Sequence, residues 1–96
     1  MTRAEICSRI EDVGIVPIIR APSSAMAIRA AEAILGGGIP ILEVTMTVPD
    51  AVSVIRALRD KFGDRVLLGA GTVLDAQSVG PCVEAGAAFI VSPGFD

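Results

Sequence analysis

Glu43 lies in the middle of an apolar stretch, residues 39–45, that has the pattern of a buried strand. A carboxylate in such a place is strongly destabilising unless it is paired, hydrogen-bonded or protonated. A buried glutamate can also serve as a general acid or base, because burial moves its pKa towards neutral pH. Two interpretations stay open: a functional carboxylate, or a structural ion pair with Arg20 on the neighbouring predicted strand.

Further polar residues stand at or near the carboxyl ends of predicted strands. In parallel α/β folds, binding and catalytic sites form at that end of the sheet. Four strand ends that carry polar residues favour a site more strongly than any one of them alone. These residues are Arg20, Glu43 with Thr45, Gly71 with Thr72, and Ser92.

The segment GAGTVLD, residues 69–75, follows a predicted strand and opens a helix, as a dinucleotide fingerprint does. It has Leu74 in place of the third glycine, and no acidic residue follows at the required distance. We therefore expect no nicotinamide site here. We expect the glycines to allow a tight turn and Thr72 to face a small ligand.

Strand and helix patterns alternate along the chain at a spacing of roughly 25 residues, about one βα unit of a barrel. Continuous apolar strands predict a parallel sheet, and right-handed crossovers leave two architectures: part of a barrel or a small doubly wound sheet. We expect one α/β domain over residues 1–96. The predicted helices lie at 2–12, within 21–38, at 49–62 and at 75–85, and the predicted strands at 13–20, 39–45, 64–72 and 87–92.

Composition narrows the classes of function. The net charge is −3, so the sequence offers no basic footprint for nucleic acid or an acidic membrane. No apolar stretch approaches the roughly 20 residues that span a bilayer, and the first residues lack a signal-peptide pattern. The chain has no histidine and two distant cysteines, Cys7 and Cys82, so we expect no metal site and two reduced thiols in a cytoplasmic protein. Acid–base chemistry then falls to a carboxylate, a lysine or water.

Three segments, ILEVTMTVPDAVSVIRAL, LLGAGTVLDAQSV and EAGAAFIVSPGFD, resemble the 2-keto-3-deoxy-6-phosphogluconate/4-hydroxy-2-oxoglutarate (KDPG/KHG) aldolase family. The opening VGIVPIIRA is similar to the family's first strand. The resemblance implies a (β/α)8 TIM barrel, usually a homotrimer, that needs no metal or other cofactor. It also implies a class I aldolase, which holds pyruvate as a Schiff base on a lysine and releases an aldehyde, glyceraldehyde 3-phosphate or glyoxylate.

The resemblance assigns roles to particular residues. Glu43 would be the general acid/base that moves protons, through water, to and from the carbinolamine and the substrate hydroxyl. Thr72 would hydrogen-bond the keto-acid end of the substrate, and Pro93 would line the same pocket. Thr45, two residues after Glu43 in the LEVT motif, belongs to the same expected substrate-binding set.

Two departures from the family pattern matter. Thr47 stands where some members have a carboxylate-binding arginine, so Arg20 is expected to bind the substrate carboxylate instead. The Schiff-base lysine belongs to a motif on the family's sixth strand, whereas the single lysine here, Lys61, falls at a predicted helix end. We therefore expect the chain to be the first half of the barrel, from a truncated gene product or a partial sequence. Alone it should form no Schiff base and should self-associate or aggregate.

Three alternatives remain open from the sequence. One is a complete flavodoxin-like domain that binds a ligand or a partner protein. Another is a different phosphosugar barrel, such as a thiamine-phosphate synthase or an epimerase. The third is a half-barrel that acts only as a structural unit by pairing with itself.

Overall fold

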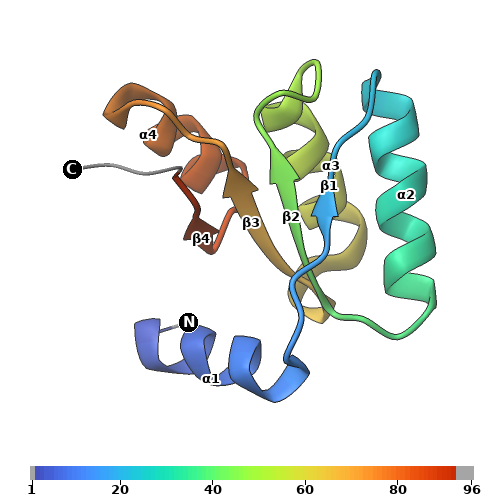
Figure 1. Cartoon of the computed structure of the whole chain (residues 1–96), viewed down its shortest axis with the longest axis vertical. Helices are drawn as coiled ribbons and strands as arrows, with labels where there is room; N and C mark the ends of the chain where they lie inside the picture. Colours follow the sequence, from blue (N-terminus) through green and yellow to red (C-terminus); the bar gives the residue numbers. More distant parts are fainter. Residues whose placement is uncertain (1, 93–96) are drawn as a thin grey trace.

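The centre of the molecule is a four-stranded parallel sheet whose strands follow one another in chain order, β1-β2-β3-β4 (Figure 1). The computed structural model describes residues 2–92. Its helices are α1 (Arg3–Val13), α2 (Ser24–Gly36), α3 (Ala51–Phe62) and α4 (Ala76–Ala85), with a short 3-10 turn, η1 (Gly63–Arg65). Its strands are β1 (Ile18–Ile19), β2 (Ile41–Thr45), β3 (Leu67–Gly71) and β4 (Phe89–Ile90).

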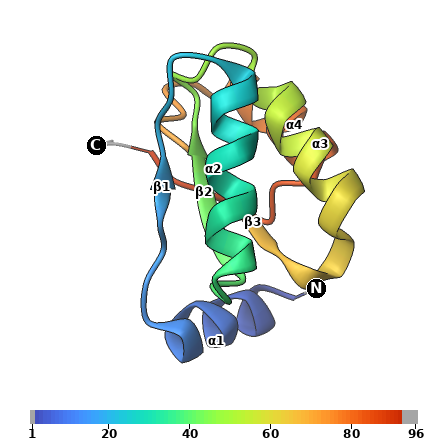
Figure 2. The ribbon, with the colours of Figure 1, turned by 90° about the vertical axis from the view of Figure 1, so that its right-hand side faces the viewer.

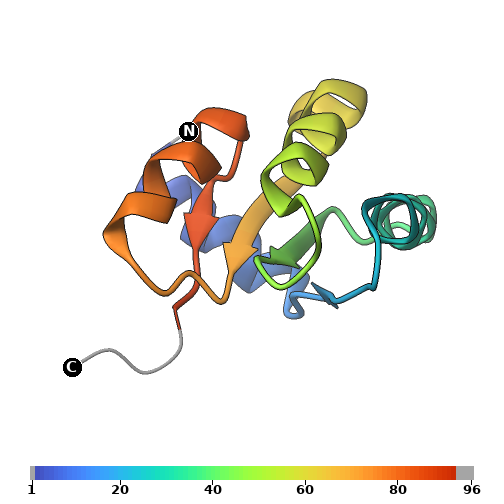
Figure 3. The ribbon, with the colours of Figure 1, turned by 90° about the horizontal axis from the view of Figure 1, so that it is seen from above.

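Helices α2, α3 and α4 lie side by side along one face of the curved sheet (Figure 3). Helix α1 lies across the end of the sheet where the strands begin (Figures 1 and 2). A doubly wound domain would instead reverse its strand order and place helices on both faces. The flavodoxin-like alternative is therefore wrong, and the arrangement is the one expected for consecutive βα units of a barrel.

The hydrophobic core lies between the helices and the facing side of the sheet. Because alternate residues of a strand point to opposite faces, Leu42 and Val44 pack into this core while Glu43 faces away from the helices. Large apolar side chains fill the space with almost no exposure. They include Ile19, Leu42, Val44, Val54, Ile55, Leu58, Leu68 and Val73.

Side-chain caps set the starts of the helices that follow β1 and β3. The Ser23 hydroxyl accepts a hydrogen bond from the Met26 N–H at 3.2 Å, and Asp75 Oδ1 accepts one from the Ser78 N–H at 2.8 Å. Each cap satisfies an N–H group that the first helical turn leaves without a partner. They fix the short loops that connect the carboxyl ends of β1 and β3 to the helices that follow.

The first strand is much shorter than the predicted span of 13–20. Val13 completes α1, and Gly14 ends that helix in the left-handed conformation with φ of 80°. Pro17 has no N–H to donate to a ladder, which suits its position beside an edge strand. Its carbonyl still accepts a hydrogen bond from the Glu43 N–H at 2.9 Å.

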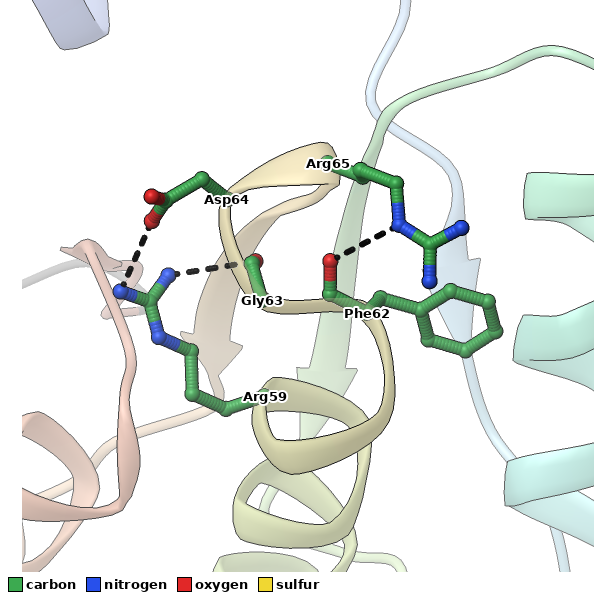
Figure 4. Close-up of polar contacts among 5 residues, drawn as sticks. All are labelled: Arg59, Phe62, Gly63, Asp64 and Arg65. Atoms are coloured by element: carbon green, nitrogen blue, oxygen red, sulfur yellow. Dashed lines mark hydrogen bonds and ion pairs between the residues drawn. The ribbon is translucent and has the colours of Figure 1, made fainter.

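The third strand begins later than predicted because the chain first makes the turn η1 (Figure 4). Arg59 closes this turn by donating to the Gly63 carbonyl at 3.3 Å and to Asp64 Oδ1 at 3.2 Å. The Arg65 Nε–H donates to the Phe62 carbonyl at 3.2 Å. These contacts hold Asp64 and Arg65 in the turn and outside β3.

The fourth strand covers two residues rather than the predicted 87–92. Its pairing with β3 extends one residue further on each side, through the Ala88 N–H to the Leu68 carbonyl and the Val91 N–H to the Ala70 carbonyl, both at 2.7 Å. The prediction was thus right about the element and wrong about its length.

No helix between residues 2 and 92 is both long and apolar enough to cross a bilayer.

Candidate active site at the carboxyl ends of the strands

Glu43 stands at the centre of the sheet face that is turned away from the helices. In the strand register it is level with Ile18 of β1 and Gly69 of β3, and Gly69 is level with Phe89 of β4. Only 6% of Glu43 is exposed. Neighbouring strands therefore bury the carboxyl group at a fixed height, two residues before β2 ends.

The Glu43 carboxylate has no hydrogen bond or ion pair to any residue in the range 2–92. Burial raises its pKa above the ordinary glutamate value of 4.5, and the positive charge of Arg20 lowers the pKa by a smaller amount. Arg20 is exposed and makes no ion pair with Glu43. The structural ion pair with Arg20, one of the two interpretations of the sequence, is therefore not formed. The carboxyl group is free to exchange protons with a ligand or water.

The backbone of β3 provides the surface against which this carboxylate lies. A Cβ atom placed on Gly71 would overlap the Glu43 carboxylate, with Glu43 Cδ at 2.5 Å and Cγ at 2.9 Å. A Cβ atom on Gly69 would overlap the ring of Phe89 in the same way. Sequence reasoning assigned no such role to these glycines or to Phe89, although glycines two apart on a strand signal that something packs closely on one face.

Two threonines follow Glu43 at the end of β2. Thr45 is completely buried, and its hydroxyl is hydrogen-bonded to the hydroxyl of Thr47, which lies on the exposed turn beyond. The paired hydroxyls retain further donor and acceptor capacity. They extend a polar surface from Glu43 towards the solvent.

Thr72 adopts a left-handed conformation with φ of 57°, which is uncommon for a β-branched residue. Such a conformation costs on the order of 1–3 kcal/mol and tends to occur at functional sites. Its neighbours hold it in place, because the Gly71 carbonyl accepts from the Met46 N–H at 2.8 Å and the Val73 N–H donates to the Val91 carbonyl at 3.2 Å. Strand β3, next to Glu43, is therefore followed directly by a strained residue that carries a hydroxyl.

The remaining predicted residues lie at the margins of this site. Arg20 comes directly after β1, one residue beyond the register pair Ile19–Val44, so it stands level with Thr45. Ser92 is partly buried and lines a hollow of about 360 Å³. Its hydroxyl has no partner among the described residues. Pro93 lies outside the described residues.

The single lysine lies at the opposite end of the sheet. Lys61 is in the last turn of α3, which runs back towards the start of the strands, and it forms an ion pair with Glu32 of α2. Its ammonium lies 5.6 Å from the centre of the Phe62 ring. Lys61 therefore lies at a helix end away from the carboxyl ends of the strands.

The cysteines are also separate from the site chemistry. Cys7 is exposed, and Cys82 is buried, with its sulfur 3.5 Å from the Met46 sulfur. Burial raises the pKa of the Cys82 thiol. Within residues 2–92, no group of three or more histidine, cysteine, aspartate or glutamate side chains could hold a metal ion.

A comparison with protein families matches residues 6–96 to the family described as "Aldolase: KDPG and KHG aldolase". The chain belongs to the KDPG and KHG aldolase family. It is 40% identical over 91 residues to the 2-dehydro-3-deoxy-phosphogluconate aldolase of Treponema pallidum, a match covering 95% of this chain and 43% of the relative. It is 40% identical over 81 residues to the KHG/KDPG aldolase of Escherichia coli K12, covering 84% of this chain and 38% of the relative. The chain thus spans about two fifths of the length of these relatives.

Solved aldolase structures share the fold. The Zymomonas mobilis ZM4 KDPG aldolase, solved with 3-phosphoglycerate, matches with a TM-score of 0.83 and 35% identity over 99% of this chain and 44% of its own. The Legionella pneumophila KDPG aldolase, solved with pyruvate captured as a covalent carbinolamine, matches with a TM-score of 0.75 and 40% identity over 84% of this chain and 39% of its own. The predicted family and the predicted α/β class, with four strands of a TIM barrel, are confirmed. The chain therefore does not belong to the alternative phosphosugar barrels, such as a thiamine-phosphate synthase or an epimerase.

The raised pKa of Glu43 predicts a pH-dependent stability change. Burial favours the neutral carboxyl group in the folded state. Glu43 therefore does not lower the free energy of unfolding below its ordinary pKa of 4.5, and it lowers that free energy increasingly as the pH rises from there through the pKa of the folded state. Glu43→Gln should therefore raise the free energy of unfolding at neutral pH and change it much less in acid. Urea unfolding at both pH values measures this, with Glu84→Gln on the exposed face of α4 as the control. A gain from Glu43→Gln that is larger in acid than at neutral pH would contradict the account.

Proposed function

We propose that this chain carries the Glu43 side of the active site of a class I aldolase. The reaction is the cleavage of 2-keto-3-deoxy-6-phosphogluconate or 4-hydroxy-2-oxoglutarate to pyruvate and an aldehyde. The observation that carries the proposal is a buried, unpaired carboxyl group at the carboxyl ends of parallel strands. The names of the relatives and the pyruvate carbinolamine of the Legionella enzyme support it.

Glu43 is suited to the proton transfers of such a cleavage. When a lysine amine adds to the keto carbon of the substrate, the carbinolamine must gain a proton on oxygen to lose water and become a Schiff base. The hydroxyl on the carbon to be released must then lose its proton, so that the carbon–carbon bond breaks and its electrons move into the imine. A carboxyl group with a raised pKa can both donate and accept these protons, directly or through water.

The neighbouring residues supply binding contacts in this proposal. Thr72, at the strained end of β3, hydrogen-bonds the keto-acid end of the substrate. Arg20 and the hydroxyls of Thr45 and Thr47 bind the substrate carboxylate where some members of the family use an arginine, and Pro93 lines the same pocket. Since Lys61 is at the other end of the sheet, the Schiff-base lysine is not among the 96 residues of this chain.

The location and assembly are also proposals. The free thiols of Cys7 and Cys82 agree with a cytoplasmic enzyme, and a protein that contains the whole barrel would be a homotrimer, as the family resemblance implies. For the 96-residue chain itself we propose self-association. Strands β1 and β4 are both sheet edges, and Ile15, Ile18 and Val91 are 55%, 53% and 41% exposed.

A chimera tests the role of Glu43 in catalysis. The matched segment of the Treponema aldolase is replaced by this chain, so that the relative supplies the remaining strands. Glu43→Gln keeps the shape of the side chain but removes proton transfer, and should lower kcat by about 10²- to 10⁴-fold. Glu84→Gln is the control and should leave kcat unchanged. An unaltered kcat in the Glu43→Gln chimera would assign Glu43 a structural role only.

Borohydride trapping tests the placement of the lysine. The 96-residue chain, incubated with pyruvate and borohydride, should give no covalent adduct by mass spectrometry, because Lys61 lies away from the strand ends and is paired with Glu32. The chimera serves as the positive control and should be trapped. A stoichiometric pyruvate adduct on Lys61 together with turnover would overturn the proposal.

Sedimentation tests the behaviour of the isolated chain. With two free edges and exposed apolar residues on the face of Glu43, the 96-residue chain should sediment as a dimer or larger species. Ile18→Lys places a charge on this face within β1 and should shift the distribution towards monomer. A monomer that melts sharply and cooperatively without any change on dilution would contradict this expectation.

A further inference from the structure

We propose that Gly71 is a positioning residue for Glu43: the absence of a side chain at Gly71 lets the Glu43 carboxylate lie across the backbone of β3 at the site. The inference rests on the proposed function for its meaning in catalysis, but its geometry stands independently. Glu43 starts level with Gly69, and its carboxylate reaches up the same face to Gly71, which is level with Thr45.

A side chain at Gly71 would collide with one neighbour, Glu43. The three atoms nearest to a Cβ on Gly71 all belong to the Glu43 side chain. The overlap would be with the carboxyl end of a flexible side chain, so an alanine at this position can be accommodated only if the carboxylate moves. Gly71 is fully part of β3 and has no left-handed backbone, so conformational freedom does not explain the glycine.

The direction of that movement follows from the surroundings. β3 contributes glycines to this face, and β4 contributes the ring of Phe89 over Gly69, so neither presents a charge to Glu43. On the β1 side lie the half-exposed Ile18 and the guanidinium of Arg20. A carboxylate pushed off β3 moves towards β1, where it is better solvated and closer to a positive charge. Both effects lower the pKa of Glu43.

The consequence for the site is that Gly71 keeps the carboxyl group protonated to higher pH and directed at the end of β3, next to Thr72. Without this arrangement Glu43 would become an ordinary exposed acid near Arg20. The glycine therefore helps to determine both the position and the proton affinity of the proposed acid/base, although Gly71 itself touches no substrate.

The test is a double-mutant cycle on the 96-residue chain, followed by urea unfolding in acid and at neutral pH with every variant at the same protein concentration. Gly71→Ala should increase the equilibrium constant for unfolding by about tenfold in acid, where Glu43 is neutral in both states. At neutral pH the increase should be smaller, because the displaced carboxylate no longer carries the penalty of a buried charge. In the Glu43→Ala background Gly71→Ala should have little effect at either pH.

Gly80→Ala is the matched control, since no atom lies within 4 Å of a Cβ at that position, and its effect should not depend on pH or on Glu43. If Gly71→Ala abolishes folding, recovery of folding in the Glu43→Ala, Gly71→Ala double variant supports the proposal, and failure to recover overturns it. An effect of Gly71→Ala that is the same at both pH values and in both backgrounds also overturns it. None of these readouts uses catalysis, so an unaltered kcat in the Glu43→Gln chimera would refute the proposed role of Glu43 in catalysis and leave this inference standing.

Discussion

A buried carboxyl group without a partner sets the main physical constraint on this structure. Within residues 2–92, Glu43 lies 6% exposed between β1 and β3 with no hydrogen bond to its carboxylate. Such a group is destabilising when charged, and the protein tolerates it because the opposite face of the same strand packs firmly against the helices. Leu42 and Val44, on either side of Glu43 in sequence, are completely buried in that core. The core thus supports the unfavourable placement of a buried carboxyl group.

The two ends of the sheet have different properties. The polar groups of the candidate site lie at the carboxyl ends of β2 and β3. They are Glu43, the linked hydroxyls of Thr45 and Thr47, and the strained Thr72. At the start of the strands, the ionic groups make contacts that stabilise turns and helix ends, such as Arg59 with Asp64 and Lys61 with Glu32. This polarity is that of a (β/α) barrel, in which one edge serves chemistry and the other serves stability.

Much of this could be predicted from the sequence because the signals were local. The apolar strands and the helix patterns between them are set by residues close together in the chain, and all four α-helices and all four strands were predicted. The candidate site followed from polar residues at strand ends, a rule of parallel sheets that needs no detailed geometry. The lengths of β1 and β4 and the turn η1 could not be predicted, since they depend on edge pairing and on the contacts of Arg59 and Arg65. The overlap of Glu43 with Gly71 was missed for the same reason, because it joins residues 28 positions apart through the register of two strands.

Glu43 is buried and has no partner among residues 2–92, so it should hold its proton to higher pH than an ordinary glutamate does. The most direct measurement is a carbon-13 NMR titration of the Glu43 carboxyl group in the 96-residue chain, assigned by the resonance that disappears in Glu43→Gln. The account predicts a midpoint above the ordinary glutamate value of 4.5. A midpoint at or below 4.5 would show that the carboxylate is solvated or paired with Arg20, and would contradict the account.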